Sequence, residues 1–199
     1  MAEVVAIFAE GSTEIEFYKA VVINARELMG TPFKCEIEYA DIKGIGNYKS
    51  NALRKFSSLQ KKYQDKKIQV FLCIDHDVFE LQKKPPIDKK KVKQAILDAG
   101  AQNVTFIEAN QSIEDWFLHD LGGVILYLRL SKKTKRPKGN GQAALKALFN
   151  QANRVYVKGS KTEGFIEKLN ILKIMSYCCK ELKPLCNSLG LNCTKICNK

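Results

Sequence analysis

The sequence predicts an α/β protein with a largely parallel sheet. Short apolar runs recur as far as residue 109, and each is followed by a segment with helical periodicity. Residues 68–74, IQVFLCI, are mostly apolar, as in an inner parallel strand that is buried on both faces. Buried strands that alternate with amphipathic helices are typical of parallel α/β sheets.

Four strands are expected in this part, at residues 4–9, 34–40, 68–74 and 103–109. Thr13 is expected to cap the first helix, with Glu16 completing a capping box, and Gly30 to end it. Residues 52–63 give the next amphipathic helix. Asp88 should cap a third helix that ends at Gly100. Ser112 with Asp115 forms a second capping box, for a short helix that runs to residue 121.

The pattern changes from residue 122 onward. Residues 131–141, SKKTKRPKGNG, read as a basic loop, followed by a helix at 142–150, a short strand at 154–157 and a long helix at 163–182. We therefore expect a core domain over residues 1–121 and a mainly helical C-terminal extension over 122–199 that packs on it.

The chain is strongly basic, with 33 Lys and Arg against 21 Asp and Glu and a net charge of +12. Such a balance favours a polyanionic partner, nucleic acid first and an anionic membrane second. No apolar run reaches membrane-spanning length, and Glu3 and Glu10 stand where a signal peptide would be basic and then apolar. We expect a cytoplasmic protein with no membrane partner and with its seven cysteines reduced.

Two carboxylates follow the most apolar strand. Because side chains of extended chain alternate, Asp75 and Asp77 should point to one side and His76 to the other. The carboxylates repel each other unless a cation lies between them, and Mg²⁺ prefers such oxygen ligands. The alternative is a strand that ends in polar turn residues.

Further acids are expected at the same edge of the sheet, because ligands of open α/β sheets bind outside the carboxyl ends of the strands. Glu10 follows the first strand, Glu14 lies on the next helical turn, and Glu114 follows the fourth strand. Glu14 and Glu114 also suit the dipole of a helix N-terminus, and capping explains Glu16 and Asp115 better than metal binding does.

The histidines have simpler explanations. His76 is turned away from the acids and fits a bystander or a group behind the ligands, and His119 fits a packed helix residue. Neither has a partner at zinc spacing.

These motifs resemble a known family. Glu10-Gly11 after one strand and Asp75-His76-Asp77 after another resemble the TOPRIM domain of topoisomerases, primases and OLD-family nucleases. The strings EGSTEIEFY, CIDHDVF and NQSIEDWFLHDL are similar to the small RloB-like TOPRIM proteins found among bacterial phage-defence genes. The resemblance covers residues 4–121, with a weaker echo at 156–159.

The resemblance implies a Rossmann-like TOPRIM sheet and a Mg²⁺- or Mn²⁺-dependent nuclease that cleaves DNA or RNA, with tRNA as one candidate substrate, in anti-phage defence. Asp75 and Asp77 would hold metal, Glu10 would be a ligand or general acid–base group, and Glu14 matches the second acid of the OLD-type motif. Lys158 would neutralise charge on the reacting phosphate, although a surface lysine is an equally good explanation. The predicted catalytic residues are Glu10, Glu14, Asp75, Asp77, Glu114 and Lys158, and the predicted metal ligands are Glu10, Glu14, Asp75 and Asp77.

The chain departs from these relatives, because it has no topoisomerase tyrosine context, no primase zinc ribbon and no ATPase P-loop. A stand-alone nuclease, activated by a partner ATPase or another defence protein, fits these departures. The alternative is a non-enzymatic nucleic-acid-binding or regulatory subunit with a structural Mg²⁺ ion.

The basic loop is the predicted nucleic-acid contact, through Lys132, Lys133, Lys135, Arg136 and Lys138. It contains no aromatic residue, which favours backbone over base recognition, and a solvated loop is the alternative. The last cysteines, at positions 178, 179, 186, 193 and 197, lack a CxxC pair, so packed thiols are favoured over a zinc site.

Overall fold

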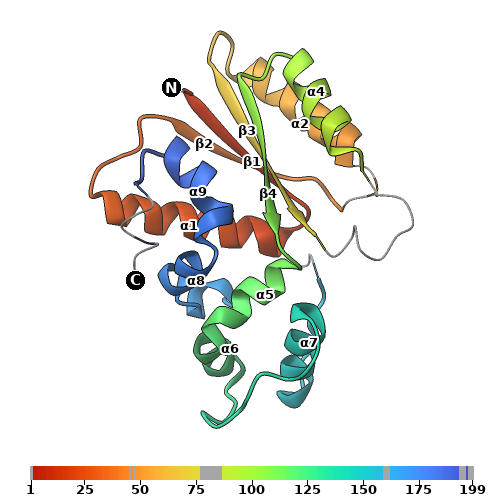
Figure 1. Ribbon diagram of the computed structural model, residues 1–199, viewed down its shortest axis with the longest axis vertical. Coiled ribbons are helices and arrows are strands. Elements are labelled where there is room, and N and C mark those ends of the chain that lie inside the picture. The colour runs from red at the N-terminus through yellow and green to blue at the C-terminus, as the bar shows by residue number, and fades with distance from the viewer. Residues whose placement is uncertain are drawn as a thin grey trace.

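The computed structural model describes residues 2–44, 46, 48–76, 87–158, 162–192 and 196. Its centre is a sheet of four parallel strands in the order β2-β1-β3-β4 (Figure 1). The strands are β1 (Val4–Ala9), β2 (Glu36–Asp41), β3 (Ile68–Asp75) and β4 (Asn103–Ala109). The predicted α/β class is confirmed, and the all-parallel sheet flanked by helices is consistent with a Rossmann-like fold.

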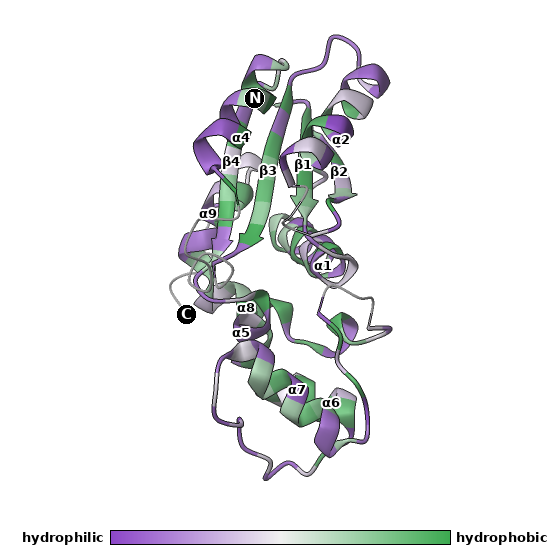
Figure 2. Cartoon of the chain, turned by 90° about the vertical axis from the view of Figure 1, so that its right-hand side faces the viewer, coloured by the Kyte–Doolittle hydropathy of each residue, from purple (hydrophilic) through white to green (hydrophobic). Residues whose placement is uncertain are grey.

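The two central strands form the buried middle of the sheet. All six residues of β1 are buried, as is every residue of β3 except Gln69. Figure 2 shows these strands as the most hydrophobic segments of the sheet. In the register between them, Phe8 pairs with Leu72, so the chain leaves both strands at about the same level.

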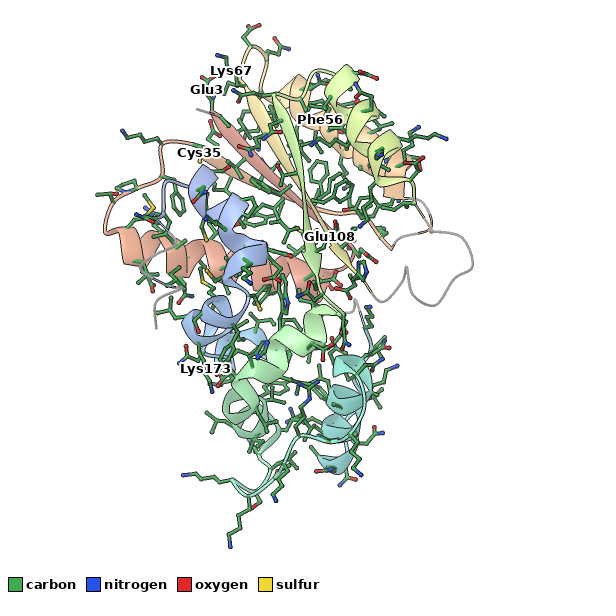
Figure 3. The ribbon with its side chains drawn as sticks, viewed as in Figure 1. Glu3, Cys35, Phe56, Lys67, Glu108 and Lys173 are labelled. Atoms are coloured by element: carbon green, nitrogen blue, oxygen red, sulfur yellow. The ribbon has the colours of Figure 1, made fainter. Side chains whose placement is uncertain are left out.

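Helices cover both faces of the sheet. On one face lie α2 (Tyr48–Lys62) and α4 (Lys89–Asp98), and Phe56 of α2 points toward the strands (Figure 3). On the other face lie α1 (Ser12–Met29) and α9 (Cys179–Ser188). This double cover explains why β1 and β3 are apolar on both sides.

The remaining helices pack beyond the carboxyl ends of the strands (Figure 1). They continue the hydrophobic core that underlies α1, partly through edge-to-face contacts between Phe117 and Phe165. These elements are α5 (Ile113–Phe117), η2 (Leu118–Asp120), α6 (Leu121–Leu128), α7 (Gly141–Gln151), η3 (Ile166–Lys168) and α8 (Ile171–Tyr177).

Several predicted helix boundaries are confirmed. Gly30 ends α1 in the left-handed conformation, and Gly100, also with positive φ, follows α4. Asp88 caps α4 by accepting a hydrogen bond from the Lys91 N–H. The Thr13 cap is wrong: α1 begins at Ser12 after Gly11, and Thr13 is buried within the first turn.

Two predictions for the C-terminal extension are wrong. Residues 154–157 form no strand. The expected helix over 163–182 is divided into η3, α8 and α9. The break before α8 occurs at Asn170, because its side chain caps α8 while its backbone N–H donates to Asp120 Oδ2 at 2.8 Å.

The cysteines only partly follow the expectation that they are reduced. Cys179 takes part in a disulfide bond, whereas Cys35, Cys73, Cys178 and Cys186 are free thiols. In the described ranges no helix combines the length and the hydrophobicity needed to cross a membrane.

Candidate functional site

The strand order creates a crevice between β1 and β3. From β1 the chain passes through α1 to β2 on one side, and from β3 it passes through α4 to β4 on the other. Neighbouring strands whose connections run in opposite directions leave a gap at their carboxyl ends, which is where open α/β sheets bind ligands.

Acidic side chains from three elements meet at this crevice. Asp75 is the last residue of β3, Glu14 lies in the first turn of α1, and Glu114 lies in α5. Their exposed fractions are 4%, 6% and 0%. Glu10, directly after β1, is partly exposed beside them. The prediction that these four acids share one edge of the sheet agrees with their positions.

Asp75 is held by two contacts. Its Oδ1 accepts a hydrogen bond from the Ile113 N–H at 2.9 Å, and its Oδ2 lies 2.7 Å from Lys158 Nζ. The first contact joins the end of β3 to the start of α5, and the second brings in a residue from the C-terminal extension. Lys158 is therefore part of this cluster and not an isolated surface lysine.

Glu114 is fully buried and is held by a tyrosine. The Tyr156 hydroxyl donates to Glu114 Oε1 at 3.0 Å, whereas Glu114 Oε2 has no hydrogen-bond partner among the described residues. Burial, and then the charge of Glu114, raise the pKa of Tyr156, which keeps the hydroxyl protonated as a donor.

Glu14 shows the electrostatic cost of the cluster most clearly. Burial raises the pKa of its carboxyl well above the usual range, and the charges of Asp75, Glu10 and Glu114 raise it further. Lys158 lowers the pKa, but by less than these effects combined. Glu14 Oε2 is buried with no hydrogen-bond partner within the described ranges. Its position therefore favours either a proton or a bound cation.

The oxygen donors at the crevice are of the chemical type that a small, hard cation prefers. Glu10, Glu14 and Asp75 line a cavity of about 10 Å³, at the lower limit for holding one water molecule. Carboxylate oxygens are the ligands that Mg²⁺ and Mn²⁺ prefer. Within the described residues, no three His, Cys, Asp or Glu side chains are arranged tightly enough to hold a metal ion. Asp77, the remaining predicted ligand, lies outside the described residues.

Sequence reasoning missed Tyr156 and the Ile113 N–H. Around Tyr156 the burial alternates, because Tyr156 is 4% exposed between Val155 at 79% and Val157 at 53%. The sequence predicts a strand at residues 154–157, but in the structure this segment forms no strand and directs Tyr156 and Lys158 toward the acids.

The basic loop lies against the helix that carries Glu114. Lys132, Lys133, Lys135 and Lys138 are exposed, which agrees both with a phosphate-binding segment and with a solvated loop. Arg136 differs, because its Nη2 lies 2.7 Å from Asp115 Oδ1 in α5.

The second capping box forms only in part. Ser112 is the N-cap of α5 as predicted, but its hydroxyl lies 3.2 Å from the Asp115 carboxylate and makes no capping bond to the backbone.

The start of α7 is also pressed onto α5. A Cβ at Gly141 would come within 2.3 Å of the Asp115 backbone nitrogen. The loop is thus anchored to α5 at Arg136 and, where it enters α7, at Gly141.

The two histidines lie away from the carboxylate crevice. His76 Nδ1 is 3.6 Å from Glu108 Oε2, and Lys89 pairs with the same carboxylate. His119 stacks on Tyr177 with parallel rings 4.4 Å apart.

Comparisons with known proteins give no relative: the chain matches no protein-family model, no curated protein and no solved structure.

Proposed function

We propose that this protein is a nuclease that hydrolyses phosphodiester bonds with the help of Mg²⁺ or Mn²⁺. The observation that carries the proposal is the burial of Glu14, Asp75 and Glu114 at the β1–β3 crevice, where Lys158 pairs with Asp75. Such a cluster has an excess of negative charge, which a divalent cation would neutralise.

Glu10, Glu14 and Asp75 would hold the cation, together with Asp77. When bound, the cation would polarise the phosphate and lower the pKa of a water molecule. Glu14 would exchange its proton for the cation, because its raised pKa reflects burial among negative charges. Tyr156 would keep Glu114 oriented. Lys158, whose Nζ lies beside Asp75 Oδ2, would then be available to pair with a phosphate oxygen.

Nucleic acid is the proposed substrate because the chain carries a net charge of +12 and an exposed lysine loop. The resemblance of Glu10-Gly11 and Asp75-His76-Asp77 to TOPRIM motifs supports the same chemistry. A role in anti-phage defence and a partner ATPase rest on that resemblance alone.

A second candidate is a nucleic-acid-binding or regulatory subunit whose acids hold a structural Mg²⁺ ion. It is favoured by the burial of Glu14, Asp75 and Glu114, because buried carboxylates are poorly placed to reach a substrate.

Cleavage assays distinguish the two candidates. Purified protein is incubated with plasmid, single-stranded DNA and total tRNA in Mg²⁺, in Mn²⁺ or in EDTA. The nuclease proposal expects cleavage of at least one substrate with metal and none in EDTA. Tight binding without cleavage, also with candidate partner proteins added, would favour the binding subunit.

A separate prediction concerns the contribution of the loop lysines to nucleic-acid affinity. Replacing Lys132, Lys133, Lys135 and Lys138 together by glutamine should weaken binding of all sequences alike. For each lysine–phosphate pair removed, the slope of log affinity against log salt should flatten by about 0.9 on duplex DNA and about 0.7 on a single strand. An unchanged slope would mean that the loop is only solvated surface. Arg136 is left intact because its ion pair with Asp115 has a structural role.

A further inference from the structure

A second pocket lies beside α5 and is lined by Asp115 and Trp116, the two residues that follow Glu114. It has a volume of about 310 Å³, within the range of small-ligand sites. We call it the His119–Tyr177 pocket, and its lining includes Asn110, Asp115, Trp116, His119, Arg136 and Tyr177.

The pocket contains an aromatic platform that is open on one side. One face of the Tyr177 ring is stacked on His119, with an interplanar angle of 0°. Tyr177 is nevertheless 62% exposed, so its other face is open to solvent. An exposed aromatic face of this kind is the feature on which unpaired bases stack, and it accepts any base because every base has a π-face.

Polar groups around the platform suit a nucleotide. Arg136 carries five N–H donors, so its ion pair with Asp115 leaves donors for a phosphate or a base. The Asn110 amide donates to Glu181 Oε1 at 3.0 Å, which fixes the amide and directs its carbonyl oxygen as an acceptor for base N–H groups. The aromatic groups that the basic loop lacks are thus supplied by η2 and α8.

The pocket is connected to the carboxylate crevice through α5. Glu114 belongs to the crevice, and its neighbour Asp115 lines the pocket. Asn110 follows β4, whose last residue, Ala109, pairs with Asp75. A nucleotide seated in the pocket would therefore lie beside the elements that carry the crevice acids.

We propose that the His119–Tyr177 pocket binds an unpaired base, so that the substrate is single-stranded or locally unpaired nucleic acid. A base in a duplex is covered on both faces by its neighbours and cannot reach the Tyr177 ring. The inference rests on the proposed function for its link to cleavage, but the binding itself can be measured without any reaction.

The test measures binding in EDTA, where no cleavage takes place. The probes are a labelled single strand, a duplex that contains the same sequence, and free AMP. Trp116 is the only tryptophan of the chain and lines the pocket, so its fluorescence reports directly on occupancy. The single strand should change the Trp116 emission, while the duplex and AMP should change it far less at equal concentration.

Tyr177→Ala should weaken single-strand binding by about 5- to 150-fold, and duplex binding should be little changed. Tyr177→Phe keeps the ring and should bind like the wild type. Leu126→Ala is the matched control, because Leu126 is 67% exposed and does not line the pocket. Thermal unfolding of each variant tests whether the fold is kept.

Three results would overturn the inference: equal single-strand affinity of Tyr177→Ala and wild type, equal losses on the single strand and the duplex, or AMP binding as tight as the oligonucleotide. Failure of the nuclease proposal looks different. In that case the single strand binds in a Tyr177-dependent manner, but no substrate is cleaved after metal is added.

Discussion

Two groups of acids on the same sheet differ in how their charge is neutralised. On the edge strand β2, Glu38 lies 2.6 Å from Lys62 Nζ and accepts from the Tyr63 hydroxyl at 2.5 Å, while Glu36 pairs with Lys66. The hydrogen bond from Lys66 lowers the pKa of Glu36. Burial raises the pKa of Glu38, but the bonds from Lys62 and Tyr63 outweigh it and the net shift is downward.

At the crevice the net pKa shift of Glu14 has the opposite sign. Glu14 and Asp75 share the charge of Lys158, and the pKa of Glu14 is raised by burial and by its acidic neighbours. The β2 acids are satisfied by lysines of this chain and need no ligand. The crevice acids retain an electrostatic cost, and such a cost is typical of sites that bind or react.

The largest expected difference between the two groups is in activity. Asp75→Asn and Glu14→Gln should each reduce metal-dependent cleavage by about 100-fold or more, since each removes a charged oxygen ligand. Asn is chosen at position 75 because its carbonyl oxygen can still accept the Ile113 N–H bond. Initial cleavage rates at fixed Mg²⁺ measure the effect.

Glu36→Gln on β2 is the matched control and should leave the rate unchanged. Full turnover by Asp75→Asn would contradict the assignment of the crevice as the reaction site.

A smaller effect is expected on stability as a function of pH. Because the folded-state pKa of Glu14 is raised above its ordinary 4.5, its contribution to stability is present below pH 4.5 and is lost as pH rises through the folded-state pKa. Relative to wild type without metal, Glu14→Gln should gain stability as pH rises through this window. Denaturant unfolding at several pH values measures the difference.

Mg²⁺ should raise the free energy of unfolding of the wild type by about 2.7 kcal/mol when its concentration is 100 times its Kd. Glu36→Gln should respond to Mg²⁺ as the wild type does. An equal Mg²⁺ response in Glu14→Gln would remove Glu14 from the ligand set.

The smallest expected effect is the difference in stability between two variants that each lose a tyrosine hydroxyl. Tyr156→Phe leaves Glu114 buried without its donor and should lower the free energy of unfolding by about 1–3 kcal/mol. Tyr63→Phe removes a similar bond to Glu38, which keeps Lys62, and should cost less than about 1 kcal/mol. Urea unfolding of both variants measures the two losses, and equal losses would mean that the two acid groups do not differ as described.

The core of the fold could be predicted from the sequence because its signals are local. The apolar runs of β1 and β3, the Asp88 cap and the glycines that end α1 and α4 each depend on neighbouring residues. The gathering of Glu10, Glu14, Asp75 and Glu114 followed from a general rule about the carboxyl ends of parallel strands.

The contacts that the sequence did not reveal are long-range. Nothing near Tyr156 indicates that its hydroxyl bonds Glu114, and the alternation of buried and exposed residues around it resembles a strand. The helix over 163–182 looked continuous because the bond from the Asn170 N–H to Asp120 joins segments far apart in the chain. Tertiary contacts of this kind override local propensity.

The contacts of Tyr156 and Lys158 have a consequence for the protein during its synthesis. All four strands have been translated once residue 109 is added, and chains begin to fold from their N-terminal part while they are being made. Glu14 and Asp75 can therefore meet at the sheet edge before their lysine has been translated. A ribosome-bound chain that ends before residue 156 therefore lacks both Tyr156 and Lys158, so the cluster of acids at the crevice is still incomplete.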